Sequence, residues 1–295
     1  ETVAVYPGDK NNLPYDVVVE RLHIEEPEPP APVTEPEKTF EEVLDEHPVS
    51  IQVNGQWQTF PNAKAAEEAS YEEYKANLRR NAKNFRITDE HLGEGGPKAK
   101  FQANVNAIRL LKELEFAGQQ ASPEQQEILS RYVGWGGIPD AFDPEKLAWA
   151  SEYTQLKELL TPEEYAAARS STLNAHYTSP TVIQAIYEAV GRMGFETGNI
   201  LEPSMGVGNF FGMLPEEMRN SRLYGVELDP VSGRIAKQLY PKADITVGGF
   251  ETTDRRDFFD LAIGNVPFGQ YQVNDKVYNK LNFNIHNYFF GATRS

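Results

Sequence analysis

Residues 199–211 read NILEPSMGVGNFF. The apolar pair Ile200 and Leu201 runs into an acid and a turn, and Gly206 and Gly208 follow just before a second apolar run. This order predicts a β-strand that breaks into a glycine loop and then a helix. Because glycine has no Cβ, a ligand can approach the backbone there, and a helix N-terminus favours a polar or anionic group. Taken alone, such a loop is more often only a tight turn between strand and helix.

Three further strand-like segments follow the glycine loop. Residues 223–229 read LYGVELD, so a second strand ends in Glu227, and an acid at that point of a βαβ unit suits a ribose diol. Residues 243–248 form a third candidate strand, and residues 258–268, FFDLAIGNVPF, form a fourth. The pattern predicts an α/β fold with a Rossmann-like, doubly wound, mostly parallel sheet, whose ligand lies at the carboxyl ends of the strands.

Helical signals dominate the chain upstream of this sheet. Residues 101–115 carry apolar side chains at helical spacing, and capping boxes begin at Ser122 and Thr161. A turn at residues 134–137, GWGG, lies between them. We expect Trp135 to be buried in the core; the alternative is a platform on which a nucleic-acid base stacks. The sequence therefore predicts an α-helical N-terminal layer beside the sheet.

The first hundred residues carry no assignable chemistry. A hairpin should turn at Asn54-Gly55, and a helix and a glycine-rich loop at residues 93–97 should follow. With Lys98 and Lys100 nearby, that loop could cradle a phosphate, although a flexible connector is the favoured interpretation. We expect five parts in the chain: the end of a preceding segment (1–23), an acidic proline-rich linker (24–48), a small accessory element (49–100), the helical layer (101–171) and the sheet domain (172–295).

Composition limits the classes of function. The 295 residues include no cysteine, which excludes disulfides and cysteine-zinc sites. No apolar run approaches the ~20 residues that cross a bilayer, so we expect a cytoplasmic protein with no membrane partner. His176 and His286 have no partners at ligand spacing, and we expect no metal site. The net charge of the chain is −16. Residues 1–95 hold 9 Lys/Arg and 20 Asp/Glu, a net charge of 9 − 20 = −11, so most of the negative charge lies in this segment. The remaining residues could therefore present a local basic face to DNA.

The segments LEPSMGVGNFF, VELDP and IGNVPF together resemble the S-adenosylmethionine-dependent N6-adenine DNA methyltransferases. In that family a glycine loop, an acid after the second strand and an Asn-Pro-Pro-Tyr/Phe tetrad occur in this order. Residues 176–180, HYTSP, are similar to the family's cofactor-contacting segment. The likeness covers residues 172–295. The segment IGNVPFG, together with ILSRYVGWGG upstream, resembles segments of the methylase-like domains found in very large helicase-type proteins of conjugative plasmids and transposons.

The resemblance implies S-adenosylmethionine as cofactor, DNA with a flipped adenine as substrate, and a helicase domain of the same full-length protein as a partner. Asn265 and the backbone carbonyl of residues 265–266 would accept the hydrogens of the adenine amine, Pro267 would stiffen the turn, and Phe268 would stack on the base. The implied cofactor contacts are Tyr177, Thr178, Glu202, Ser204, Gly206, Gly208, Asn209, Phe210, Glu227, Leu228 and Phe250.

Two positions depart from the family pattern. Val266 replaces the second residue of the tetrad, normally proline, which keeps the carbonyl but loosens the geometry. Gly248 and Gly249 stand where an acid usually binds the cofactor's adenine, and Phe250 or Glu251 could substitute for it.

The length of the chain sets two further expectations, and two alternatives to the proposed activity stay open. The sheet of the family has about three more strands, so we expect a sheet truncated after the fourth strand and an isolated chain without turnover. One alternative is a catalytically degenerate fold that binds DNA or a protein partner. A second alternative is methyl transfer to a protein amide, because the same tetrad serves that chemistry.

Overall fold

The computed structural model describes residues 47–173, 177–253, 255, 257–270 and 272–293, and the chain divides into two compact units. One unit holds most of a hairpin of β1 (Val49–Val53) and β2 (Gln56–Phe60) and the start of α2 (Ala63–Asn81). Asn54 and Gly55 have φ angles of 53° and 75°, as a type I′ turn requires, so the hairpin prediction is confirmed. The expected segment 1–23 and nearly all of the expected linker lie outside the described residues.

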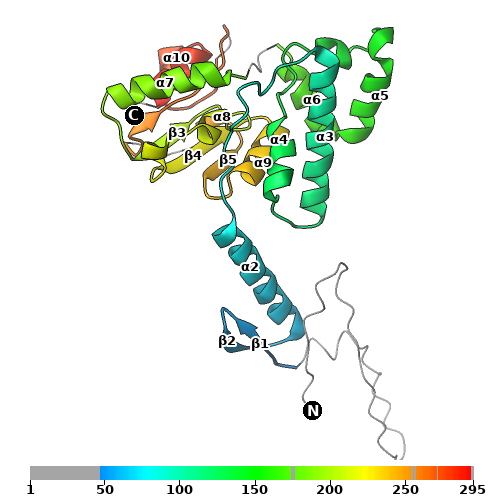
Figure 1. The fold of residues 1–295 in the computed structure, drawn as a ribbon, viewed down its shortest axis with the longest axis vertical. Helices are drawn as coiled ribbons and strands as arrows, with labels where there is room; N and C mark the ends of the chain where they lie inside the picture. The colour runs from blue at the N-terminus through cyan, green and yellow to red at the C-terminus, as the bar shows by residue number, and fades with distance from the viewer. Residues whose placement is uncertain (1–46, 174–176, 254, 256, 271, 294–295) are drawn as a thin grey trace, which may run out of the picture. The chain divides into compact units, whose positions relative to one another are not determined.

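A four-stranded parallel sheet forms the centre of the second unit (Figure 1). Its strands lie in the order β5-β4-β3-β6. Because β3 pairs with both β4 and β6, the direction in which strands are added reverses at β3, which is a topological switch point. The sheet is compatible with a Rossmann-like fold. Its strands are β3 (Asn199–Glu202), β4 (Arg222–Glu227), β5 (Asp244–Val247) and β6 (Leu261–Ala262).

Side chains alternate between the two faces of this sheet. Ile200 belongs to the main hydrophobic core, whereas its neighbour Leu201 belongs to a second cluster on the other face. Glu202 lies opposite Gly225 in the register, and Glu227 lies two residues further along β4. Both acids therefore project from the same face of the sheet, at its carboxyl edge.

Helices pack on both faces of the sheet (Figure 1). On one face α9 (Pro230–Leu239) contacts β4 and β5. On the other, α10 (Ile285–Ala292) buries Tyr288 and Phe289 in the second cluster. The other elements of this part are α7 (Pro180–Arg192), α8 (Asn209–Gly212) and the 3-10 turns Glu216–Met218, Phe250–Thr252 and Asn279–Leu281.

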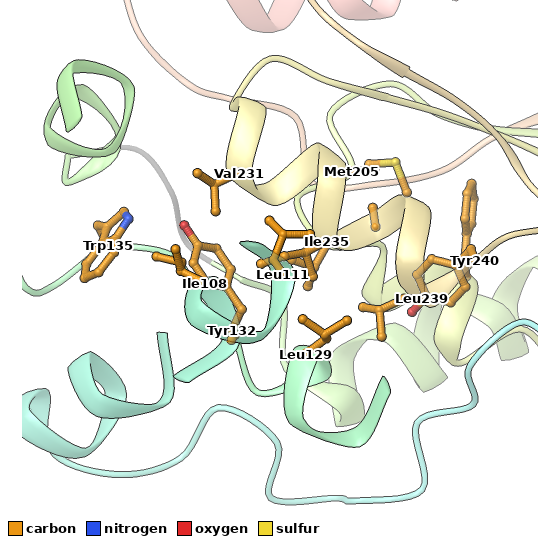
Figure 2. Close-up of a cluster of buried hydrophobic side chains, with 14 of the residues drawn as sticks. Ile108, Leu111, Leu129, Tyr132, Trp135, Met205, Val231, Ile235, Leu239 and Tyr240 are labelled. Atoms are coloured by element: carbon orange, nitrogen blue, oxygen red, sulfur yellow. The ribbon is translucent and has the colours of Figure 1, made fainter. Parts of the chain in front are cut away.

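The helices expected upstream of the sheet are observed, and both capping boxes form. Figure 2 shows Ile108, Leu111 and Leu129 of this layer close to Val231, Ile235 and Leu239 of α9 in one cluster of buried side chains. The layer and the sheet thus share a hydrophobic core. The helices of the layer are α3 (Pro97–Phe116), α4 (Pro123–Ser130), α5 (Ala150–Leu159) and α6 (Pro162–Ser171), with 3-10 turns at Pro139–Phe142 and Leu147–Trp149.

A buried carboxylate, Glu164, joins three helices. It accepts a hydrogen bond from Thr161 N at the start of α6 (2.9 Å) and from Lys112 Nζ of α3 (2.8 Å), and it pairs with Arg234 of α9. Because each acceptor oxygen has partners, the buried charge is compensated. These contacts hold the helical layer against α9, which packs on the sheet.

The turn around Trp135 is structural. Its indole is 1% exposed and packs edge-on against Phe101 and Phe142, with ring centroids 6.0 and 5.3 Å away. Buried Asn104 of α3 accepts from Val133 N (2.9 Å) and donates to Gly134 O (2.6 Å). The prediction that Trp135 lies in the core is confirmed. Within the described residues, no helix has the length and apolar character needed to cross a lipid bilayer.

Candidate functional site

The glycine loop after β3 adopts a backbone that only glycine accommodates well. Gly206 and Gly208 have φ angles of 56° and 83°, in the left-handed region. A Cβ on Gly208 would lie 2.6 Å from the Tyr240 ring, and one on Gly206 would lie 3.0 Å from the Tyr177 ring. Two tyrosine rings therefore fill the space that the absent side chains leave, and Tyr177 lies against the loop as one wall of the site.

Glu227, at the end of β4, holds this loop in place. Its Oε2 accepts a hydrogen bond from Gly206 N (2.6 Å), and its Oε1 accepts one from Asp229 N (2.7 Å). Burial raises the pKa of the Glu227 carboxyl to about 7, even though the hydrogen bond from Asp229 N acts in the opposite direction. A carboxylate has further lone pairs, so Glu227 can accept hydroxyl donors while it keeps both backbone contacts.

Two other carboxyl groups at this edge each have a buried oxygen with no hydrogen-bond partner among the described residues. Glu202 is 2% exposed, and its Oε2 has no hydrogen-bond partner among the described residues. Burial, and then the nearby charge of Glu227, raise the pKa of Glu202 well above its usual range. Asp229 caps α9 through Oδ1, which accepts from Ser232 N at 2.7 Å, while Oδ2 is buried without a described partner. Buried acceptors are normally satisfied, so this edge is suited to a ligand with hydroxyl or cationic groups.

A cavity of about 240 Å³ adjoins the Tyr177 side of the loop. Of the predicted cofactor residues, Tyr177, Thr178 and Asn209 line it. The Tyr177 hydroxyl lies 3.4 Å from Ser232 Oγ of α9, and burial raises the pKa of Tyr177 well above its usual range, with the charge of Glu227 acting in the same direction. Tyr177 therefore stands between this cavity and the acidic edge. His176, in the same HYTSP segment, lies outside the described residues.

Part of the cavity wall was not predicted from the sequence. Glu94 lines it from the loop before α3, Lys100 from the first turn of α3, and Tyr132 from the segment just after α4. The glycine-rich run before Lys100 was a weak signal of a ligand loop, and a connector was favoured because no strand precedes it. The pairing of this loop with Tyr177 depends on how α3 packs on α4 and α9, and no local sequence pattern predicts that packing.

The other predicted cofactor residues take varied positions. Ser204 is half-buried, Phe210 is buried, and Leu228 is 75% exposed beside Glu227. Phe250 packs in the second cluster, where its ring stacks on Phe289 with centroids 5.3 Å apart. The structure thus brings Glu202, the glycine loop, Glu227 and Tyr177 together, whereas Phe250 contacts α10.

The tetrad of residues 265–268 follows β6 at the same edge of the sheet. Ile263 N donates to Leu201 O (2.9 Å), and a Cβ on Gly264 would lie 3.3 Å from Glu202 Cγ, so the tetrad begins next to Glu202. Asn265 is exposed, as is Phe268, whose ring centroid is 6.0 Å from that of His286.

The other two tetrad residues, Val266 and Pro267, are half-buried, and Val266 packs against the second cluster. None of the four lines the cavity. In the described parts of the chain, no group of three or more His, Asp or Glu side chains could hold a metal ion.

Two known proteins are similar to parts of this chain. The "Defense against restriction protein B" of Escherichia phage P1 is 28% identical over 180 residues, which are 60% of this chain and 6% of that protein. The type II methyltransferase M.CvrRI of Paramecium bursaria Chlorella virus XZ-6E is 39% identical over 92 residues, 31% of this chain and 24% of that protein. No protein-family model and no solved structure matches the chain. The chain spans a quarter or less of either relative, and the matches support a methyltransferase-like domain.

Proposed function

We propose that this chain is part of an S-adenosylmethionine-dependent methyltransferase that acts on the N6 amine of adenine in DNA. One observation carries the proposal: the glycine loop, the buried acid Glu227 and the Asn-Val-Pro-Phe tetrad all follow neighbouring strands at one edge of the sheet. That edge contains the switch point between β3 and β6, where open α/β sheets bind their ligands. A cofactor site and a base site can therefore adjoin there.

The residues at the edge fit the proposed cofactor. Glu227 would accept hydrogen bonds from the ribose hydroxyls, as its remaining lone pairs allow. Glu202, buried with Oε2 unpartnered among the described residues, can accept a hydrogen bond from the amino group. Tyr177 and Thr178 would hold the amino-acid end in the adjoining cavity. When bound, S-adenosylmethionine supplies a methyl group on a positively charged sulfur, and the chain's task is to bind and orient it.

The tetrad fits the other reactant. The amine of adenine is a poor nucleophile because its lone pair is delocalised into the ring. The Asn265 side-chain oxygen and the next backbone carbonyl would accept the amine hydrogens, which draws electron density back onto nitrogen and fixes its direction. Val266 in place of proline keeps that carbonyl. Phe268 is 69% exposed, and such a ring can stack on a base that has left the duplex.

DNA as the substrate is supported by the names of the two similar proteins and by the resemblance of the tetrad. The partnership with a helicase domain rests on the resemblance alone. A catalytically degenerate module that binds DNA or a protein is the second candidate, favoured by Val266 and by glycines at 248 and 249. Methyl transfer to a protein amide is a third candidate, because the tetrad is compatible with it.

Transfer of a tritiated methyl group to mixed-sequence DNA by the full-length protein tests the proposal. We expect incorporation as N6-methyladenine, and we expect Asn265→Ala to lower it roughly 100-fold or more, the scale for a lost transition-state hydrogen bond. Cofactor affinity should be nearly unchanged, because Asn265 acts on the amine. The control is Asn287→Ala, at an exposed position of α10. Cofactor binding with no incorporation into DNA would favour the degenerate module, and label on protein would favour the amide substrate.

A further inference from the structure

Two lysines in the first turn of α3 have different surroundings. Lys98 Nζ donates to Ala148 O (2.7 Å), pairs with Glu152 (2.6 Å) and lies 3.8 Å from the centre of the Trp149 ring. Lys98 therefore anchors α3 to the start of α5. Lys100, two residues on, is half-buried and lines the cavity beside Tyr177.

In the described parts of the chain, no carboxylate lies within 4 Å of the Lys100 ammonium group. The carboxylate on the same cavity wall, Glu94, pairs instead with His91 at 3.1 Å. The main chain of Lys100 is fixed, because its N–H donates to Gly96 O (3.1 Å) in the first helical turn. A lysine that lines a polar cavity can bind an anion through its ammonium group.

We propose that Lys100 binds the carboxylate at the amino-acid end of the methyl donor, and this inference rests on the proposed function. Thr178 and Asn209, on the same cavity wall, offer hydroxyl and amide groups to the rest of that end. Tyr177 joins the cavity to the glycine loop, because its ring lies against Gly206. The helical layer thus contributes a binding residue to a site otherwise built by the sheet domain.

The dimensions of the cavity favour one end of a small ligand. Its volume of about 240 Å³ is below the roughly 300–1,000 Å³ of pockets that enclose a whole drug-sized molecule. The nucleoside part would then lie outside it, toward Glu227 and Leu228. A DNA phosphate is the competing anion for Lys100, but three predicted cofactor residues, Tyr177, Thr178 and Asn209, line the cavity, and Phe268 of the tetrad does not.

Two ligands that differ in this end alone allow a direct test. S-Adenosylhomocysteine carries the amino-acid end, and 5′-methylthioadenosine lacks it. We would measure both dissociation constants by calorimetry for the wild-type chain, Lys100→Met, Lys100→Arg and the control Lys237→Met, at an exposed position of α9. Lys100→Met should weaken S-adenosylhomocysteine roughly 10- to 150-fold, the scale of a hydrogen bond to a charged group, and should leave methylthioadenosine unchanged. Lys100→Arg should restore most of the affinity, and Lys237→Met should match the wild type.

The outcomes separate this inference from the proposed function. Wild-type binding of S-adenosylhomocysteine that Lys100→Met does not weaken would overturn the role of Lys100 and leave the proposed cofactor in place. Equal weakening of both ligands would also overturn it, because a carboxylate contact cannot affect methylthioadenosine. A variant that loses affinity for DNA alone would assign Lys100 to a phosphate. If the wild-type chain binds neither nucleoside, the proposed cofactor is contradicted, and this inference with it.

Discussion

Glu202 is a buried acid whose protonation is linked to folding. Burial raises its folded-state pKa above the ordinary value of 4.5, so the folded chain keeps a proton that the unfolded chain releases. The stabilisation from Glu202 is complete below about pH 4.5 and is lost as the pH rises above that value. Glu227, with a pKa of about 7, contributes in the same direction between about pH 4.5 and 7.

We therefore expect the free energy of unfolding of the wild type to fall as the pH rises from about 5 to 8. Glu202→Gln removes one titrating proton and should flatten this fall by at most ~1.4 kcal/mol per pH unit. Urea denaturation at several pH values measures the effect. Parallel curves for wild type and variant would show that Glu202 ionises normally in the folded chain.

At the residue scale, the sequence is informative where the backbone imposes a residue type. The left-handed turns at Gly206 and Gly208 and the acid at the end of β4 follow from the local pattern. The rings that fill the loop do not, because Tyr240 is brought to Gly208 by the packing of α9. The hydrogen bond from Gly206 N to Glu227 is likewise a tertiary contact between two strand ends.

At the scale of elements, we expect truncation of the Trp135 side chain to be among the most destabilising substitutions in the core. Trp135→Ala removes a fully buried indole, and we expect it to lower the free energy of unfolding by about 3–5 kcal/mol. Trp57→Ala is the matched control: Trp57 is 71% exposed, and its loss should change stability by less than about 0.5 kcal/mol. Urea denaturation followed by far-UV circular dichroism compares them. A small effect of Trp135→Ala would contradict the structural role of the turn.

Element boundaries were predicted well where a cap or turn residue marks them. The capping boxes at Ser122 and Thr161 begin helices as expected. The helix expected from residue 101 begins at Pro97, because proline is favourable in the first turn, where its missing N–H has no intrahelical partner. The fourth strand, expected within residues 258–268, is limited to Leu261–Ala262. Beyond it, Gly264 weakens a regular ladder and Pro267 has no N–H to donate to one.

At the scale of the whole molecule, the fold class was predictable and the cavity was not. Four strands, a glycine loop and a strand-end acid predict a parallel α/β sheet, and the observed order β5-β4-β3-β6 is compatible with that. The cavity joins residues before α3 to the segment before α7, about eighty positions apart. The shared core, the contacts of Glu164 and the packing of Tyr132 against Tyr177 are tertiary contacts that bring these segments together.

The central claim is that this edge of the sheet binds S-adenosylmethionine through Glu227. The most direct measurement is calorimetric titration of the chain with S-adenosylhomocysteine, for the wild type, Glu227→Ala and the exposed control Glu188→Ala. We predict saturable one-to-one binding that Glu227→Ala weakens by about 1.5–3 kcal/mol, roughly 10- to 150-fold, and that Glu188→Ala leaves unchanged. Absence of binding by the wild type, or equal affinities for wild type and Glu227→Ala, would contradict the account.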